Sequence, residues 1–219
     1  MSARCIKVII LLISFQVYAV HAHEPGDWLV RIGPALIEPN DDSNDVDGLA
    51  NSEVGVDGDV TLGFTIGYML TSNWAIELLG VTPSEHDLQG RGSIGGLGDI
   101  GDVDVFPPTL SLQYHFTNQG RFNPYVGAGL NYTHFSNANA SASLETALGG
   151  DTSIDIDDSW GLSAHAGVDV FISDSFFVNA AIWYVDIDAD ATLNTGAVDR
   201  DVDIDIDPWV FFVGIGKSF

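Results

Sequence analysis

Long neutral segments in which apolar and small or polar residues alternate constrain this chain more than any other feature. In the segment 60–70, the even positions hold Val, Leu, Phe, Ile, Tyr and Leu, and the odd positions hold Thr, Gly, Thr, Gly and Met. A period of two residues is typical of a β-strand with one apolar face. A strand usually runs for about 5–6 residues, whereas a tilted strand that crosses a membrane needs about 9–11. The length of the alternation therefore favours a membrane strand.

The alternation recurs along the chain and predicts about eight antiparallel strands. The three clearest repeats span residues 106–116, 160–172 and 209–215. Short turns are predicted at residues 71–73, 117–123 and 173–175. These turns alternate with long connections, which is the arrangement of outer-membrane β-barrels. The predicted strands cover residues 26–38, 58–70, 74–88, 102–116, 124–138, 156–172, 176–192 and 200–219.

The acidic residues gather in the long connections. The chain has 31 acidic and 7 basic residues and a formal charge of −24, although 46% of its residues are hydrophobic. The acidic clusters occupy residues 41–59, 99–104, 151–158, 186–190 and 199–207. After residue 22, no apolar run is long enough for a membrane helix. The expected fold class is therefore all-β, an eight-stranded antiparallel transmembrane β-barrel with short periplasmic turns and long acidic extracellular loops.

The first 22 residues have the three parts of a secretory signal peptide. Arg4 and Lys7 form a basic start, residues 8–20 form an apolar run, and cleavage is expected after Ala22. The run is too short to cross a hydrocarbon core of about 30 Å comfortably, and no stop-transfer charges follow it. We therefore expect a signal peptide over 1–22 and an outer-membrane β-barrel domain over 23–219, exported to the outer membrane of a Gram-negative bacterium.

Composition excludes several partners and cofactors. The chain expected after cleavage keeps five basic and all 31 acidic residues, a formal charge of −26. Nucleic acid is excluded, because binding phosphates requires Lys and Arg. The only cysteine, Cys5, leaves with the signal peptide, so no disulfide or thiolate metal site is expected. No metal or cofactor is predicted, since His86, His115 and His165 are scattered and have no metal-ligand spacing.

Aromatic residues mark the predicted strand ends, as in an interfacial girdle. They include Tyr68, Trp74, Tyr114, Phe116 and Tyr125. The chain ends on Phe219, and a terminal aromatic residue on the last strand is the assembly signal that the barrel-assembly machinery reads. Lys217 departs from the usual pattern, although its ammonium can snorkel at the membrane edge. The expected partners are this machinery, outer-membrane lipid and lipopolysaccharide, for a chain that acts as a monomer.

Several short stretches, taken in order, are similar to one known family. They are His23–Trp28, Asn73–Leu79 with Thr82 and Pro83, Pro107–Leu110, Phe122–Tyr132, Asp158–Gly161, Asn179–Asp188 and Asp207–Val210. Over essentially the whole mature chain, the sequence resembles the OmpW family of small outer-membrane barrels, which includes the alkane-uptake protein AlkL. This resemblance implies an eight-stranded barrel with an apolar lumen that takes up small hydrophobic compounds and can open sideways into the membrane.

Beyond the membrane zone, the alternation keeps its period but exchanges its chemistry. In the strand 176–192, aspartates continue the lipid-side face, while aliphatic residues continue the inward face, and the strands 102–116 and 200–219 repeat this. We therefore expect a collar with acidic outer walls and an apolar throat. The throat residues are Val103, Val105, Val185, Ile187, Val202, Ile204 and Ile206. Such a throat suits a hydrophobic solute, because burying its surface contributes about 25 cal/mol per Å².

Two observations leave an alternative open. Eight-stranded interiors are just wide enough for side chains to fill them, so the aliphatic residues could simply close the top of the barrel. In the sixth strand, Ile154 and Ile156 share the parity of Trp160. Either a bulge at residues 157–158 shifts the register or the exchange is absent there.

A constriction and an exit can also be placed. Leu79 and Trp183 fall on inward faces by alternation, and the lumen constriction implied by the resemblance maps onto them. Pro83 lies in the third predicted strand, and Pro107 and Pro108 lie in the fourth. None of these prolines can donate a ladder hydrogen bond. They could form a lateral gap through which an apolar solute leaves into the bilayer, or only a bulge or bend.

The predicted function is an outer-membrane channel for passive uptake of small hydrophobic molecules, and no enzyme. A lipid-modifying enzyme would need a pair such as Ser136 and His134, for which no acidic partner is evident. The other alternative is a structural or receptor barrel with a closed lumen, whose acidic loops bind divalent cations, lipopolysaccharide or external partners. Residues 151–158 and 199–207 offer oxygen ligands, but neither segment matches a spaced calcium loop.

Overall fold

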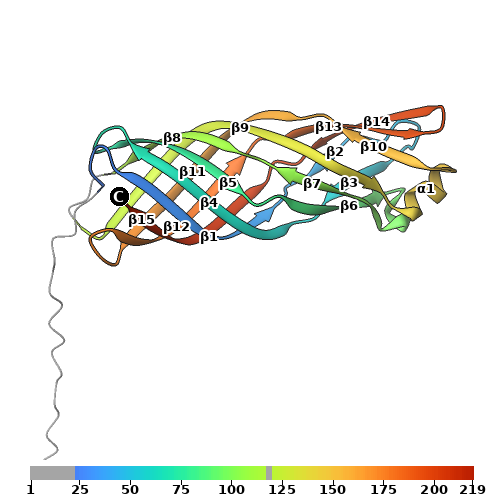
Figure 1. The fold of residues 1–219 in the computed structure, drawn as a ribbon. Helices are drawn as coiled ribbons and strands as arrows, with labels where there is room; N and C mark the ends of the chain where they lie inside the picture. The colour runs from blue at the N-terminus through green and yellow to red at the C-terminus, as the bar shows by residue number, and fades with distance from the viewer. Residues whose placement is uncertain (1–22, 117–119) are drawn as a thin grey trace, which may run out of the picture.

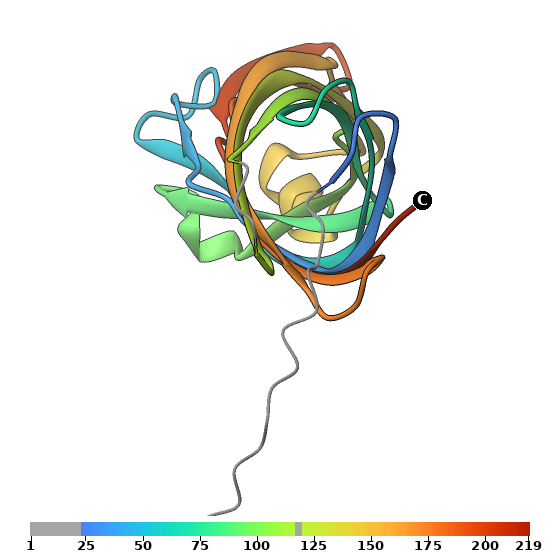
Figure 2. The ribbon, with the colours of Figure 1, turned by 90° about the vertical axis from the view of Figure 1, so that its left-hand side faces the viewer.

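Eight strands hydrogen-bond around a closed ring in the computed structural model, which describes residues 23–116 and 120–219. Each strand pairs antiparallel with the next, and the last pairs with the first. In ring order they are β1 (Trp28–Glu38), β4 (Asp59–Met69), β5 (Trp74–Val81), β8 (Thr109–His115), β9 (Phe122–Ala140), β11 (Ser159–Phe171), β12 (Phe176–Val185) and β15 (Trp209–Ser218). Figure 2, along the barrel axis, shows the closed ring. The predicted eight-stranded barrel is confirmed.

The outer face of this ring is apolar. Along β1, exposed and buried residues alternate without exception. Large apolar side chains point outward around the ring, among them Leu62, Leu110, Leu130, Leu162 and Ile215. Because these side chains face away from the lumen, they form the surface that a bilayer would cover. The part of the chain that the structure describes holds no helix both long and apolar enough to cross a membrane.

The barrel continues beyond this apolar zone as a collar. Figure 1 shows the collar strands at the end opposite the short turns, with α1 (Ala142–Leu148) at its rim. The upper half of β9 pairs on one side with β7 and on the other with β10. The remaining collar elements are β2 (Asp42–Ser43), β3 (Ser52–Val56), β6 (Ser84–Gly92), η1 (Gly95–Leu97), β7 (Asp99–Phe106), β10 (Thr152–Ile156), β13 (Asp188–Thr195) and β14 (Val198–Asp205).

Side chains close the collar where β2 and β3 meet. The backbone N–H of Val54 donates to Ser43 Oγ at 2.8 Å, and that of Val56 donates to Asp41 Oδ2 at 3.0 Å. The helix α1 covers the collar's outer end. Ser141 caps its first turn, and the hydroxyls of Ser141 and Ser143 donate to the carbonyl of Asp99 at 2.9 and 2.8 Å. Its Leu144 side chain is buried among the collar residues.

Most predicted strands are interrupted at the border between barrel and collar. The predicted strands 74–88, 102–116, 156–172, 176–192 and 200–219 each form two shorter strands. Prolines lie at three of the breaks, where they remove backbone donors. The break before β15 is made by Asp207, which has a left-handed φ of 41°. Asp207 accepts hydrogen bonds from the hydroxyl of Tyr184 and the backbone N–H of Ile187.

The sixth predicted strand changes register at its break. Ile154 is buried in the collar, whereas Trp160 is exposed on the barrel, although both positions are even. The chain leaves the strand conformation at residues 157–158, between β10 and β11. Of the two interpretations of this strand, the register shift is the one observed. Ile154 therefore faces the apolar interior of the collar. The predicted turn 117–123 and the signal peptide 1–22 fall wholly or partly outside the described residues.

Candidate functional site: an apolar throat above a polar plug

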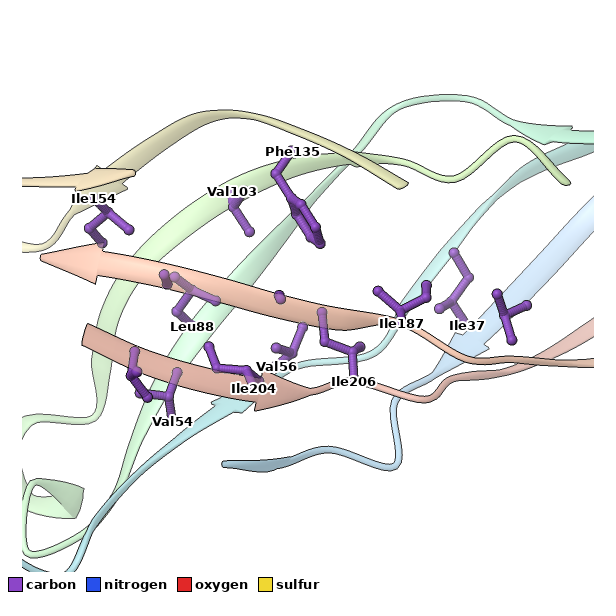
Figure 3. Close-up of a cluster of buried hydrophobic side chains, with 14 of the residues drawn as sticks. Ile37, Val54, Val56, Leu88, Val103, Phe135, Ile154, Ile187, Ile204 and Ile206 are labelled. Carbon is purple, nitrogen blue, oxygen red and sulfur yellow. The ribbon is translucent and has the colours of Figure 1, made fainter. Parts of the chain in front are cut away.

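The collar encloses a continuous cluster of aliphatic side chains. All the throat residues expected from sequence point inward: Val103, Val185, Ile187, Val202, Ile204 and Ile206 are buried, and half-buried Val105 packs against them. Figure 3 shows this cluster, including Ile187, Ile204 and Ile206, between the collar strands. The carboxylates of Asp188 and Asp205, their neighbours in sequence, are exposed on the outer wall. The apolar and acidic faces of the collar are therefore separated by the pleat of each strand.

A cavity lies at the base of the throat. Its walls come from β1, β3, β5, β6, β7, β8, β12 and β15 and from the breaks beside them, and they are almost entirely apolar. The free volume for the centre of a water-sized molecule is about 50 Å³, which is a few times what one water needs. The cavity is therefore narrow. Its lining includes Ile37, Val56, Val81, Val185, Ile187 and Val210.

The two residues expected to form a constriction lie in and below this cavity. Leu79 lines it directly. Trp183 is fully buried one inward position below Val185 and packs against His165 and Phe212, at ring-centroid distances of 5.4 and 6.1 Å. Leu79 and Trp183 both belong to the buried apolar cluster.

Below Trp183, buried charges fill the lumen. Arg31 on β1 forms ion pairs with Glu77 on β5 and Asp169 on β11. Its Nε and Nη2 atoms donate to the two oxygens of Asp169 at 3.1 and 2.8 Å. Gln113 donates to Glu77 at 2.7 Å, and Asn179 donates to Asp169 at 2.8 Å. We call these five residues the plug.

The plug places buried, paired charges across the lower lumen. Its charged side chains are all nearly or completely buried, and removing hydrogen-bonded charges from their partners is costly. The guanidinium of Arg31 also lies over the rings of Tyr125 and Phe177, 5.1 and 5.5 Å from their centroids. Sequence reasoning did not find the plug, because its members come from separate strands and show only as scattered polar residues on inward faces.

The wall of the barrel is interrupted beside the cavity. The ladder between β5 and β8 ends at the pair Leu79 and Thr109, and the ladder between β6 and β7 resumes only at Ser84 and Val105. Between these pairs, the two sides of the break do not bond to each other, and each bonds to the strand on its far side. On the first side, Thr82 N–H donates to the carbonyl of Leu62 on β4 at 2.9 Å.

The predicted prolines occupy this interruption. On its second side, the backbone N–H of Tyr132 on β9 donates to the carbonyl of Pro108 at 3.1 Å. Pro107 lines the cavity, Pro108 is half-buried, and Pro83 is exposed on the opposite side of the break. The cavity lining also includes Ser84, Val105 and Thr109, so the cavity reaches both flanks of the interruption.

The outer wall of the collar carries opposed carboxylates. Asp188 lies directly opposite Asp205, and Asp190 lies opposite Asp203. Partial burial raises the pKa of the Asp188 carboxyl above its ordinary value, and the carboxylates of Asp186 and Asp205 raise it further. Like charges directly opposite on a sheet destabilise it. Repulsion between these carboxylates therefore lowers the stability of the folded collar.

Replacing Asp188 with Asn should stabilise the barrel at neutral pH. Because the folded state raises the pKa of Asp188, stability is lost as pH rises from the ordinary carboxyl value of about 3.9 toward the raised one. The variant should gain up to about 1 kcal/mol at low salt near pH 7 and nothing at pH 3. Urea unfolding of the detergent-solubilised protein at both pH values measures this. The control, Asp199→Asn, alters a residue opposite Asn194. An equal gain at pH 3 would contradict the explanation.

The pair considered for an enzyme lies on the outer surface. His134 Nδ1 contacts Asp158 Oδ1 at 2.8 Å, and the hydroxyl of Tyr132 also donates to Asp158. These hydrogen bonds hold the pKa of Asp158 below its usual range. An acidic partner for His134 therefore exists, although sequence showed none. The group is largely exposed to solvent, without the enclosed pocket that usually surrounds reacting groups.

The last strand ends with an aromatic residue at the rim of the short turns. The N–H of Phe219 donates to the carbonyl of Trp28 at 3.0 Å, so the terminal residue continues the pairing of β15 with β1. Lys217, the departure noted in sequence, lies with its ammonium 4.2 Å from the centroid of the Phe219 ring. A cation over an aromatic face is stabilised there, which explains how an apolar end tolerates lysine.

A closed eight-stranded barrel with an apolar outer belt, an apolar throat and a polar plug defines a small outer-membrane protein. Comparison with protein families matches residues 24–219 to the OmpW family. The chain belongs to this family, as the sequence resemblance indicated. It is 43% identical to outer membrane protein W of Vibrio cholerae over 202 residues, which cover 91% of this chain and 92% of the relative.

Two further proteins extend the comparison. The chain is 29% identical to outer membrane protein AlkL of Ectopseudomonas oleovorans over 201 residues, which cover 90% of this chain and 84% of AlkL. The crystal structure of OprG from Pseudomonas aeruginosa superposes with a TM-score of 0.83 at 36% identity, covering 90% of this chain and 98% of OprG. These relatives are outer membrane proteins, and the barrel fold of this chain supports the same location.

Proposed function

We propose that this protein conducts small hydrophobic molecules passively from the cell surface into the outer membrane. A solute enters the collar, passes down the apolar throat to the cavity above Leu79 and Trp183, and leaves sideways between β5 and β8. The observation that carries the proposal is the position of the cavity, whose lower end meets the constriction and whose side meets the interrupted ladder.

Physical chemistry favours the sideways route over the axial one. An apolar solute that continued downward would have to displace the buried plug around Arg31, whose charges would lose their partners. A solute that leaves above Leu79 passes from an apolar cavity to hydrocarbon and avoids contact with periplasmic water. The exit requires only that two chain segments without mutual ladder pairing move apart.

Export and assembly complete the proposal. The signal peptide is cleaved after Ala22, and the barrel-assembly machinery recognises the strand that ends at Phe219. The mature chain acts as a monomer surrounded by lipid and lipopolysaccharide. The apolar route itself needs no cofactor and no chemical step, since the cavity lining consists mainly of aliphatic side chains.

Replacing Pro83, Pro107 and Pro108 together with Val should slow uptake of a hydrophobic solute several-fold. Valine restores a backbone donor at each position and favours a continuous ladder between the flanking strands. Uptake of a fluorescent apolar probe into cells or proteoliposomes measures the effect. The control is Pro34→Val, which restores a donor on β1, away from the interruption. Unchanged uptake in the triple variant, with wild-type folding, would argue against the lateral exit.

A second candidate function is a closed barrel whose acidic collar binds divalent cations. One observation favours it: carboxylate oxygens of Asp186, Asp188 and Asp207 lie within 4.8 Å of one another. Oxygen ligands of this kind suit Ca²⁺. Under this function, Ca²⁺ should raise the unfolding midpoint of the wild type and not that of Asp188→Asn. Equal effects of Ca²⁺ on both proteins would count against it.

A further inference from the structure

Two histidines and an aspartate meet at the end of the barrel that carries the short turns. His23 is buried beneath the plug and packs against Phe171 and Phe177, at centroid distances of 5.0 and 5.4 Å. The ring of His115 lies 5.3 Å from that of His23, nearly perpendicular to it. One nitrogen from each histidine and one oxygen of Asp169 lie within 4.8 Å of one another. This cluster takes no part in the apolar route above.

Hydrogen bonds assign the tautomer of both histidines. The Nε2 atom of His23 lies 2.9 Å from Asp169 Oδ2, which as a carboxylate can only accept. The Nε2 atom of His115 lies 3.1 Å from Gln113 Oε1. The amide nitrogen of Gln113 donates to Glu77, so the atom that faces His115 is the amide oxygen, which can only accept. Both Nε2 atoms therefore carry hydrogen, and both Nδ1 atoms present a lone pair.

These two lone pairs are buried and unsatisfied. Neither His23 Nδ1 nor His115 Nδ1 has a hydrogen-bond partner among the residues that the structure describes. Both side chains are more than nine-tenths buried, at 3% and 1% exposure. A buried nitrogen lone pair without a donor is costly. A metal ion can accept such a lone pair, since neutral imidazole is the commonest metal ligand in proteins.

The charge of the neighbourhood also favours a cation. The single positive charge of Arg31 is shared between two carboxyl groups, those of Glu77 and Asp169. An open cavity connects His23 with the surrounding solvent, and Glu24, Asp27 and Asp174 line it. Acidic side chains at an entrance raise the local concentration of cations.

We propose that His23 and His115 bind one divalent transition-metal ion at the end of the barrel that carries the short turns. Imidazole nitrogens suit Cu²⁺, Ni²⁺ and Zn²⁺, and Cu²⁺ binds most tightly in this series. Asp169 holds the His23 ring through Nε2, as carboxylates do behind metal-bound histidines. Signal-peptide cleavage after Ala22 makes His23 the first residue, so its α-amino nitrogen joins Nδ1 as a chelating pair. The ion ties residue 23 into the barrel.

The test is Cu²⁺ titration of the mature protein purified from outer membranes. We expect one Cu²⁺ per chain and an electron paramagnetic resonance spectrum split by coordinating nitrogens, with the splitting altered by ¹⁵N-histidine labelling. His23→Gln and His115→Gln should each weaken Cu²⁺ binding at least tenfold. The matched controls are His86→Gln, a buried histidine of the collar, and His134→Gln, an exposed one, and both should bind as the wild type does.

The α-amino ligand is tested without touching the fold. A protein processed with one extra alanine before His23 keeps both imidazoles but moves the amino group, and its Cu²⁺ affinity should fall. Only chains with the heat-modifiable gel mobility of folded barrels are compared. Wild-type stoichiometry that persists in the His23→Gln/His115→Gln double variant would overturn the site. If ¹⁵N-histidine labelling left the nitrogen splitting of the Cu²⁺ spectrum unchanged, the site would be overturned even if that variant failed to fold.

Discussion

Replacing Arg31 with Met should destabilise the folded barrel by about 3–5 kcal/mol. Methionine has a similar length and fills the lumen, but it leaves the buried carboxylates of Glu77 and Asp169 facing one another without their cation. The guanidinium's contacts with Tyr125 and Phe177 are lost as well. Urea unfolding in detergent micelles, followed by tryptophan fluorescence and heat-modifiable gel mobility, measures the change.

Two comparisons distinguish a charge effect from a packing effect. Arg91→Met removes the ion pair with Asp41 in the collar, whose arginine is 43% exposed, and should cost at most about 1 kcal/mol. The triple variant Arg31→Met, Glu77→Gln and Asp169→Asn removes the carboxylate charges too and should recover much of the loss. A single Arg31→Met variant as stable as Arg91→Met would show that the plug does not depend on its ion pairs.

Replacing Ile187 with Asp should lower hydrophobic uptake at least tenfold. Ile187 lines the cavity above the constriction, and a carboxylate there either stays charged and hydrated or takes up a proton. In both forms it brings water and a polar group into the cavity at the base of the apolar throat. Initial uptake rates of a radiolabelled or fluorescent apolar solute, compared at equal surface expression, measure the effect.

The control changes the adjacent position on the opposite face. Asp188→Asn alters the exposed outer wall and should leave uptake near the wild-type rate. Ile187→Ala keeps the lining apolar and enlarges the cavity, so its uptake should equal or exceed that of the wild type. At equal surface expression, loss of uptake in Ile187→Ala equal to that in Ile187→Asp would contradict an apolar route through the throat.

The barrel could be predicted from sequence because strand alternation is a local property. Each residue's face follows from its parity once the strand is recognised, and the long period-two segment 60–70 made recognition secure. The same reasoning pointed Leu79, Trp183 and the throat residues inward. It gave the shift at residues 157–158 only as one of two alternatives and did not find the break at Asp207, because a bulge or a left-handed residue depends on which neighbours satisfy the backbone.

The interior chemistry was harder to predict than the fold. Arg31, Glu77 and Asp169 lie on three strands that are remote in the chain, and a sequence gives no sign that their charges compensate one another. In the sequence, His115 is one of several scattered histidines, because metal-ligand spacing is recognisable only within one element. Its neighbours His23 and Asp169 become apparent only when β8, β11 and the segment before β1 meet at the same end of the barrel.

The position of helix α1 implies that the throat has closed and open forms, whose relative populations affect binding. Leu144 packs inside the outer end of the collar. If the proposed solute enters past this side chain, it binds only those molecules in which the segment has moved away. If about 1% of molecules are open at any moment, the apparent dissociation constant is about a hundredfold weaker than the intrinsic one. The half-saturation concentration for transport would then depend on two quantities. One is the opening equilibrium of a short surface helix, and the other is the intrinsic affinity of the cavity below it.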